Sequence, residues 1–313
     1  MLVRTEPTHV SAADLYIRVT PARSAFKREA GQNNHFLITL LVGLDSVRRG
    51  EATLQEEFST SWSPHDVSRS AERSREYALK TSLAWIENLV DLYRGQASKL
   101  PNALTISQQN EIEKEDGRSA KLRYFATRLG FLDSPELALV RLGFHWRNLV
   151  VHSEATSKLN AGVRVDLLKH AEYFAQHYRG LDIRDSLHSV DRRKAPRFKE
   201  VASIIAASQV LVKSFDSALL QKINVREYAN LVLRLYIEEQ IAAGTSNVFP
   251  KLWPGSPQKS EERITQILRQ KGFTFGQEGL ARRHPDQGGF LPKEYMERLA
   301  KADVPGAKVE LLA

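Results

Sequence analysis

The chain has 313 residues, a net charge of +8 at pH 7, 42% hydrophobic and 26% charged residues, and no cysteine. This composition is ordinary for one large or two modest globular domains, and the missing cysteines exclude disulfides, thiolate nucleophiles and sulfur-based zinc sites. No stretch approaches the roughly 20 apolar residues of a membrane span, and the N-terminus lacks the apolar core of a signal peptide, so we expect a cytoplasmic protein without a membrane partner.

The N-terminal part of the chain is expected to pass from extended to helical structure. Residues 1–30 read as an extended lead-in with a candidate strand at Asp14–Thr20. A strongly apolar helix is expected at His35–Arg49, and a long helix at Ser68–Lys99, with Glu51–Asp66 as the loop between them. The apolar residues of the long helix recur near the 3.6-residue period, at Leu79, Leu83, Ile86, Val90 and Tyr93.

Further helices complete a predicted bundle. The segment Pro101–Gly117 is polar and broken, and Arg118–Leu129 is expected to be a helix that ends at a glycine. The next helix opens with Ser134-Pro135-Glu136, an N-cap with proline in the first turn, and runs through His152. An amphipathic helix follows at Asn160–Tyr178. Together these elements predict an up-and-down helical bundle over residues 31–180.

The rest of the chain divides into three predicted segments. Residues 181–199 are rich in charge and read as a basic linker, residues 200–245 as a helical pair, and residues 246–313 as a C-terminal appendage with an irregular tail. The helices expected in the last two segments are Phe198–Lys222, Val225–Ala243 and Ser260–Lys271. The predicted fold class is therefore all-α.

One short motif points to chemistry. Arg147 is followed directly by Asn148, then by three aliphatic residues and His152, at the end of an apolar helix. An Arg with four to six residues before a His also occurs elsewhere in the chain, about as often as chance predicts, so that spacing alone carries no weight. The asparagine, the three aliphatic residues and the helical setting distinguish this match from the others.

The motif and its setting resemble the HEPN family of metal-independent ribonucleases, over residues 31–180. The resemblance implies that His152 acts as general acid or base when the ribose 2′-OH attacks the adjacent phosphate. It assigns Arg147 to stabilising the pentacoordinate transition state, and Asn148 to orienting a neighbour or holding the phosphate. These roles suit the residues, because histidine titrates near neutrality and arginine offers paired donors to phosphoryl oxygens. The resemblance implies no cofactor and no metal.

The helix that carries the motif also has a polar stripe. Arg141, His145, Asn148 and His152 fall within roughly 60° of one another at about 100° per residue, so Arg141 and His145 are candidates to line a groove. Arg147 lies about 140° from His152 on an ideal helix, so one chain cannot easily direct both side chains at one phosphate. A homodimer, in which two motif helices meet across a two-fold axis as in the HEPN family, would solve this.

Other candidate residues have simpler explanations. Glu87 and Asp91 are an i, i+4 carboxylate pair that could support the arginine, although a solvated helix face is the more ordinary interpretation. The basic runs Arg192-Arg193-Lys194 and Arg282-Arg283-His284 could guide an RNA backbone, although basic linkers are usually only solvated. No compact His–carboxylate spacing and no phosphate-binding glycine loop is present.

These observations favour an RNA endonuclease of the toxin or phage-defence kind. Its expected partners are RNA, a second copy of the chain, and an antitoxin or regulatory protein. Two alternatives stay open: a non-catalytic HEPN module that binds a partner protein, and a helical nucleic-acid-binding or scaffold protein whose only functional feature is its basic charge.

Overall fold

The computed structural model describes residues 15–52, 64–151, 158–275, 290–291 and 293–312. The chain forms two compact units. The first, here called the bundle unit, comprises Ala25–Gln96 and Ile106–Phe215. The second, the terminal unit, comprises Met1–Ser24, Ala97–Thr105 and Asp216–Ala313. The described residues are almost entirely helical apart from one three-stranded sheet, which confirms the predicted all-α class.

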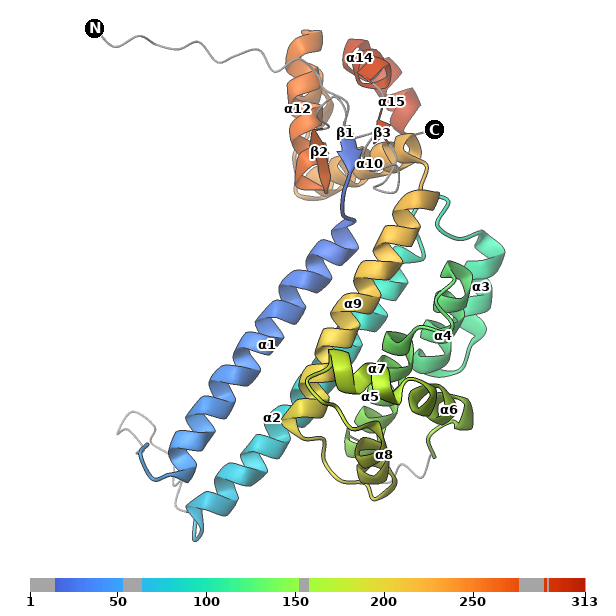
Figure 1. Cartoon of the computed structure of the whole chain (residues 1–313). Helices are drawn as coiled ribbons and strands as arrows, with labels where there is room; N and C mark the ends of the chain where they lie inside the picture. Colours follow the sequence, from blue (N-terminus) through green and yellow to red (C-terminus); the bar gives the residue numbers. More distant parts are fainter. Residues whose placement is uncertain (1–14, 53–63, 152–157, 276–289, 292, 313) are drawn as a thin grey trace, which may run out of the picture. The chain divides into compact units, whose positions relative to one another are not determined.

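Three long helices give the bundle unit its length: α1 (Pro21–Arg48), α2 (Val67–Ala97) and α9 (Phe198–Lys222) (Figure 1). Two hydrogen bonds join α1 to α2 within the apolar contact between them. The Asn33 amide donates to the Ser82 carbonyl at 3.1 Å, and the Ser82 hydroxyl donates to the Asn33 side-chain oxygen at 3.1 Å. Both residues are buried, and this reciprocal pairing satisfies polar atoms that would otherwise destabilise the core.

Six shorter helices are described in the rest of the bundle unit. These helices are α3 (Ile106–Lys114), α4 (Gly117–Leu129), α5 (Pro135–Val151), α6 (Ala161–Lys169), α7 (Ala171–His177) and α8 (Ile183–Asp191). Helix α4 ends as predicted at Gly130, whose φ of 84° only glycine adopts without strain. Most of α5 is buried up to Trp146, which is 0% exposed, so α5 runs through the core rather than over the surface.

The terminal unit combines both ends of the chain in a small mixed structure. Its elements are β1 (Leu15–Ile17), α10 (Val225–Ala242), α11 (Val248–Leu252), α12 (Pro257–Gln270), β2 (Phe273–Phe275), β3 (Phe290–Leu291), α14 (Lys293–Lys301) and α15 (Val304–Leu312). The N-terminal strand β1 is central, in the order β2-β1-β3, and pairs antiparallel with both neighbours. Gly272 allows its backbone segment to pass close to Val19, because a Cβ at position 272 would lie 2.2 Å from the Val19 carbonyl oxygen.

Several predicted boundaries are corrected in the N-terminal half. Helix α1 begins at Pro21, so residues 21–30 are helical and not part of an extended lead-in; proline suits the first helical turn because its φ is already helical. The predicted strand at Asp14–Thr20 is confirmed as the shorter β1. The polar segment Pro101–Gly117 contains helix α3, in which Ile112 is buried.

The second half of the chain is also more regular than predicted. The segment expected as one helix at Asn160–Tyr178 is two helices that meet at His170. The expected linker at residues 181–199 contains α8, whose Asp182 N-cap accepts two backbone N–H bonds and whose apolar face is buried. The tail expected to be irregular contains the short helices α11, α14 and α15 between its glycines and prolines. These helices bury apolar side chains, such as Tyr295 of α14.

Helix α9 has the length and apolar composition of a membrane span. The expectation that no stretch reaches this apolar content is therefore wrong for α9. In the structure, 61% of its most apolar window is buried within the protein. A core helix of a soluble protein passes the same test of length and composition, so the helix by itself is weak support for a membrane location.

Candidate active site

Helix α5 carries the Arg-Asn motif and is fixed firmly at its start. As predicted, Ser134 caps the helix: its hydroxyl accepts from the Leu137 backbone N–H at 3.4 Å. The buried Glu136 carboxylate accepts hydrogen bonds from the hydroxyls of Tyr173 at 2.7 Å and Tyr178 at 3.2 Å. These bonds tie the first turn of α5 to α7, so the motif at the other end stands on an anchored helix.

Trp146 and Arg147 place the motif between the core and the surface. The Trp146 indole is buried, and its N–H donates to the Lys194 carbonyl at 2.9 Å, which ties the loop after α8 to the motif helix. Arg147 is partly exposed, and its Nη1 donates to the Asn148 side-chain oxygen at 3.0 Å. The Arg147 Nε is buried without a hydrogen-bond partner among the described residues. The arginine therefore has an unused donor directed into the protein.

Glu87 of α2 lies against the face of α5 that carries Arg147. It is 1% exposed, and neither carboxylate oxygen has a hydrogen-bond partner among the described residues. A Cβ at position 143 would lie 2.9 Å from Glu87 Oε1 and 3.0 Å from Ile204 Cγ2, so Gly143 makes room for the carboxylate. Gly143 and Arg147 are four residues apart and share a helix face. Glu87 therefore lies beside the face of the motif helix that presents the arginine.

The electrostatics of Glu87 are those of a buried acid beside a cation. Burial raises its pKa well above the ordinary value of 4.5, and the positive charges of Arg147 and Arg118 oppose this shift. Among the described residues, neither carboxylate oxygen of Glu87 is hydrogen-bonded to an arginine. A buried carboxylate without a hydrogen bond is costly, and a catalytic or positioning role is one explanation for keeping it.

Within the predicted polar stripe, Arg141 and His145 face away from Arg147, whereas Asn148 accepts a hydrogen bond from it. Arg141 is buried, its Nε donates to the Ser119 hydroxyl at 3.2 Å, and it lines a cavity of about 410 Å³ with Arg123 of α4 and Asp166 of α6. His145 is half-buried; burial lowers its pKa, against the opposing charge of Asp191. Arg141 thus does line a hollow between α4 and α6. His145 points toward α6 and α8, about 160° around the helix from Arg147.

Two predicted features lie outside the described residues or at their edge. His152 belongs to a segment outside the described residues, as does the basic run Arg282-Arg283-His284. Asn148 is described and exposed. The structure therefore brings together Arg147, Asn148 and Glu87, and leaves the position of His152 to be inferred from the sequence alone.

Glu87 was the residue whose role the sequence left undecided. Its partner in the predicted pair, Asp91, is partly exposed and forms ion pairs with Arg94 at 3.0 Å and Arg118 at 3.4 Å, as a solvated face would. The interpretation of Glu87 as part of that solvated face is wrong. The helical period already contained the signal, because Glu87 is four residues after Leu83 and three before Val90, and both of these are buried.

No family model, no curated protein and no solved structure matches this chain. Within the described parts of the chain, no three His, Asp or Glu side chains come together in a way that could hold a metal ion.

Proposed function

We propose that this protein is a metal-independent RNA endonuclease of the HEPN type, acting in the cytoplasm as a toxin or defence enzyme. The observation that carries the proposal is the buried Glu87 carboxylate beside the Arg147 face of the motif helix. Arg147 acts electrostatically on this buried acid, and such an interaction favours one orientation of the guanidinium, which a catalytic arginine needs and an ordinary surface arginine does not. Glu87 is in this proposal a positioning residue, and Arg147 a catalytic one.

The proposed reaction balances without a cofactor. The ribose 2′-oxygen bonds to the adjacent phosphorus while its proton passes to a neutral His152 imidazole. The bond from phosphorus to the 5′-oxygen breaks, and a protonated histidine, supplied by His152 of a second copy, gives that oxygen its proton. Arg147 donates to the non-bridging oxygens, where negative charge gathers in the transition state. The products are a 2′,3′-cyclic phosphate and a 5′-hydroxyl.

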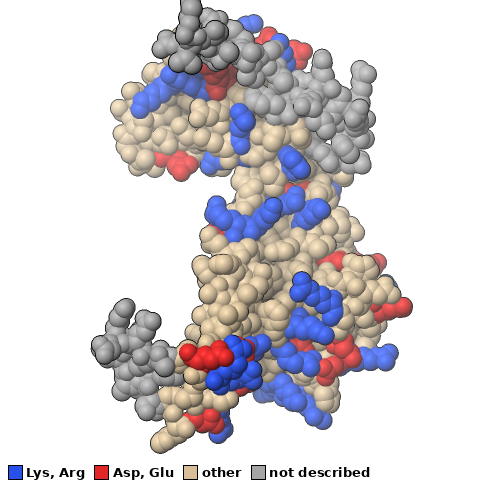
Figure 2. Space-filling view, turned by 60° about the vertical axis from the view of Figure 1, so that its left-hand side comes forward, with Lys and Arg blue, Asp and Glu red and all other residues tan. Residues whose placement is uncertain are grey.

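Basic side chains near the motif suit an RNA substrate. Arg192, Arg193 and Lys194 are exposed, and the carbonyl of Lys194 is bonded to Trp146, the residue before the catalytic arginine. On the face drawn in Figure 2, Lys and Arg side chains gather in the lower part of the view, with fewer acidic side chains between them. Such a surface favours a phosphate backbone through counterion release.

We expect the protein to be a homodimer, since two copies of the motif are needed to supply both protons. Large apolar side chains on the outer faces of α1 and α2 offer a second copy a surface to bury. They are Phe36 (51% exposed), Leu40 (54%), Val42 (66%), Tyr77 (72%), Trp85 (41%) and Leu92 (53%). Light scattering at micromolar concentration should report about twice the chain mass.

A double variant tests whether these exposed apolar side chains mediate dimerisation. Replacing Phe36 and Leu40 with glutamate should shift the protein to monomer and reduce cleavage, because charge opposes burial of that face. Replacing Ile106, which is 78% exposed on α3, with glutamate should change neither property. A wild-type protein that is strictly monomeric and still cleaves RNA would contradict the composite site.

Cleavage should persist in excess EDTA, within a factor of about two, because side chains fill every role in the proposed mechanism. Activity that disappears with EDTA and returns with Mg²⁺ or Mn²⁺ would assign the chemistry to a bound metal instead.

The direct test of the proposal is incubation of the full chain with RNA and with DNA of the same sequence. Only the RNA should be cut, because DNA lacks the attacking 2′-hydroxyl. A chain that binds a partner protein but leaves all RNA intact would favour the non-catalytic HEPN alternative.

A further inference from the structure

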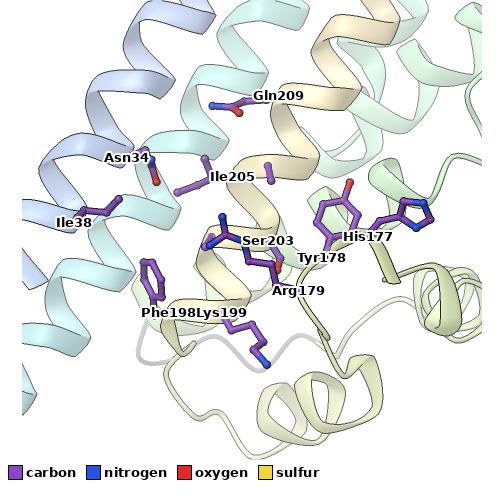
Figure 3. A pocket seen from close by; sticks show the side chains of 12 residues that line it. Asn34, Ile38, His177, Tyr178, Arg179, Phe198, Lys199, Ser203, Ile205 and Gln209 are labelled. Atoms are coloured by element: carbon purple, nitrogen blue, oxygen red, sulfur yellow. The ribbon is translucent and has the colours of Figure 1, made fainter. Parts of the chain in front are cut away.

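A second cavity of the bundle unit lies between α1, α9 and the end of α7 (Figure 3). Its volume is about 350 Å³, within the range of cavities that hold small-molecule ligands. Twelve residues line it: Asn34, Ile38, His177, Tyr178, Arg179, Phe198, Lys199, Ala202, Ser203, Ile205, Ala206 and Gln209. None of them belongs to the candidate active site.

Small residues on α9 keep the cavity open. Ala202, Ser203 and Ala206 occupy the middle of the lining face, where larger side chains would close the space between α9 and α1. Longer side chains stand at the two ends of the same face, Phe198 at one and Gln209 at the other (Figure 3). This face of α9 is therefore shaped as the wall of a hollow rather than as a core contact.

The mouth of the cavity is cationic. His177, Arg179 and Lys199 line it, and none of the lining residues is acidic. Arg179 forms no ion pair with another described residue, and its side chain extends toward α9 in Figure 3. Its backbone is left-handed, with φ of 53°, a conformation that costs free energy in a residue other than glycine. An exposed arginine held at this cost beside a lysine suits an anionic group of a ligand.

The inner wall offers a different chemistry. Ile38, Phe198 and Ile205 provide an apolar surface, and the amides of Asn34 and Gln209 provide donors and acceptors near one end. Phosphate fits the cationic mouth, a flat ring fits the apolar wall, and side-chain amides are well suited to hydrogen-bond the edge of a base. A simple anion would use only the first of these three features.

We propose that this cavity binds a nucleotide, with its phosphate at Arg179 and Lys199 and its base between Phe198 and Ile38. The ligand is either a free mononucleotide or one nucleotide of an RNA strand. Helix α9 separates this site from the candidate active site. Ile204 lies against Gly143, on the face of α5 where Glu87 also lies, whereas the next residue, Ile205, lines the cavity. Binding here does not depend on the proposed nuclease activity, since it is measured directly.

The test is isothermal titration of the full chain with 5′-AMP, adenosine and inorganic phosphate. We expect 5′-AMP to bind with a dissociation constant of about 0.1 mM or lower, and at least about tenfold more tightly than adenosine or phosphate. Arg179→Gly should weaken 5′-AMP binding about tenfold, since it removes a charge-assisted contact and relieves rather than strains the left-handed backbone. Ala202→Leu should weaken it as much by filling the cavity.

Two controls make the outcome decisive. Arg184→Ala removes an exposed arginine of α8 that does not line the cavity, and it should leave binding unchanged. A 2′-O-methylated penta-adenylate, which lacks the attacking hydroxyl, distinguishes the two sources of ligand. If it binds with the same dependence on Arg179 and Ala202 while 5′-AMP does not, the ligand is part of an RNA strand. Equal binding of 5′-AMP and adenosine, or binding of neither nucleotide probe, would overturn the proposal.

Discussion

Replacing His152 with alanine is expected to lower the rate of RNA cleavage by about 100-fold or more, since a positioned acid or base contributes about that much. The effect follows from the proposed mechanism, in which this imidazole both accepts the 2′-hydroxyl proton and, in the second copy, protonates the leaving oxygen. The measurement is the initial rate on a labelled RNA, together with the chemistry of the fragment ends. The fragments should carry a 2′,3′-cyclic phosphate and a 5′-hydroxyl, and 2′-O-methylated RNA should resist.

Arg147→Lys is expected not to preserve activity, although it keeps the charge. An ammonium group cannot reproduce the paired guanidinium donors on the phosphoryl oxygens, and it cannot place a planar group beside Glu87. Arg147 lies in the last part of α5, past the buried Trp146, and His152 follows that helix in the sequence, so circular dichroism should show little change of fold in either variant.

His145→Ala is the matched control for His152→Ala. His145 lies on the same helix, and its surroundings include Asp191 and Arg164. In the proposed mechanism it only lines the groove and moves no proton, so its replacement should reduce cleavage less than that of His152. Fragments that end in a 5′-phosphate, or a His152→Ala protein that cleaves at the wild-type rate, would refute the assignment.

The sequence predicted the elements whose apolar period is long. Helices α2, α9 and α10 begin and end within two residues of the prediction, because in each of them apolar and polar positions follow the helical period over many turns. The Ser134 cap and the Gly130 terminus were also predictable, because their side-chain and backbone requirements are local.

The sequence was less informative where short helices are stabilised by distant contacts. Helix α8 has nine residues within a run of charge, and burial of its apolar residues Ile183, Leu187 and Val190 against the rest of the unit stabilises it. The strand β1 pairs with residues more than 250 positions later in the chain, so no local pattern could predict its partners. For the candidate site, the sequence motif was enough to select helix α5. The position of Glu87 beside it depends on the space that Gly143 leaves, and that space can be recognised only once α2 and α5 are packed together.

Glu87→Gln is expected to make the protein more stable and less active. The carboxylate is 1% exposed and without a hydrogen bond among the described residues, so a neutral amide of the same shape avoids the cost of burying a charge. Arg147 loses its opposite charge, but it is partly exposed and remains hydrated. For a domain of this size, each kcal/mol gained corresponds to about 2–4 °C in Tm.

The same substitution should lower the cleavage rate by about tenfold, because a neutral amide no longer attracts the guanidinium electrostatically. Asp91→Asn is the matched control, one turn further along α2. Asp91 is partly exposed and paired with Arg94 and Arg118, so its change to asparagine should not raise Tm and should leave the cleavage rate near that of the wild type.

The dependence of stability on pH separates a buried acid from an ordinary one. Burial raises the pKa of Glu87 above 4.5, so the folded protein holds this proton at pH values where the unfolded chain has released it. Stability from this group is therefore fully present below pH 4.5 and is lost as the pH rises through the folded value. Glutamine does not titrate, so the Tm of Glu87→Gln minus that of the wild type should be small near pH 4 and should grow toward pH 8. A difference that is constant over this range, or that has the opposite sign, would show that Glu87 is not held as a buried acid beside Arg147, and the orientation of the arginine would then need another cause.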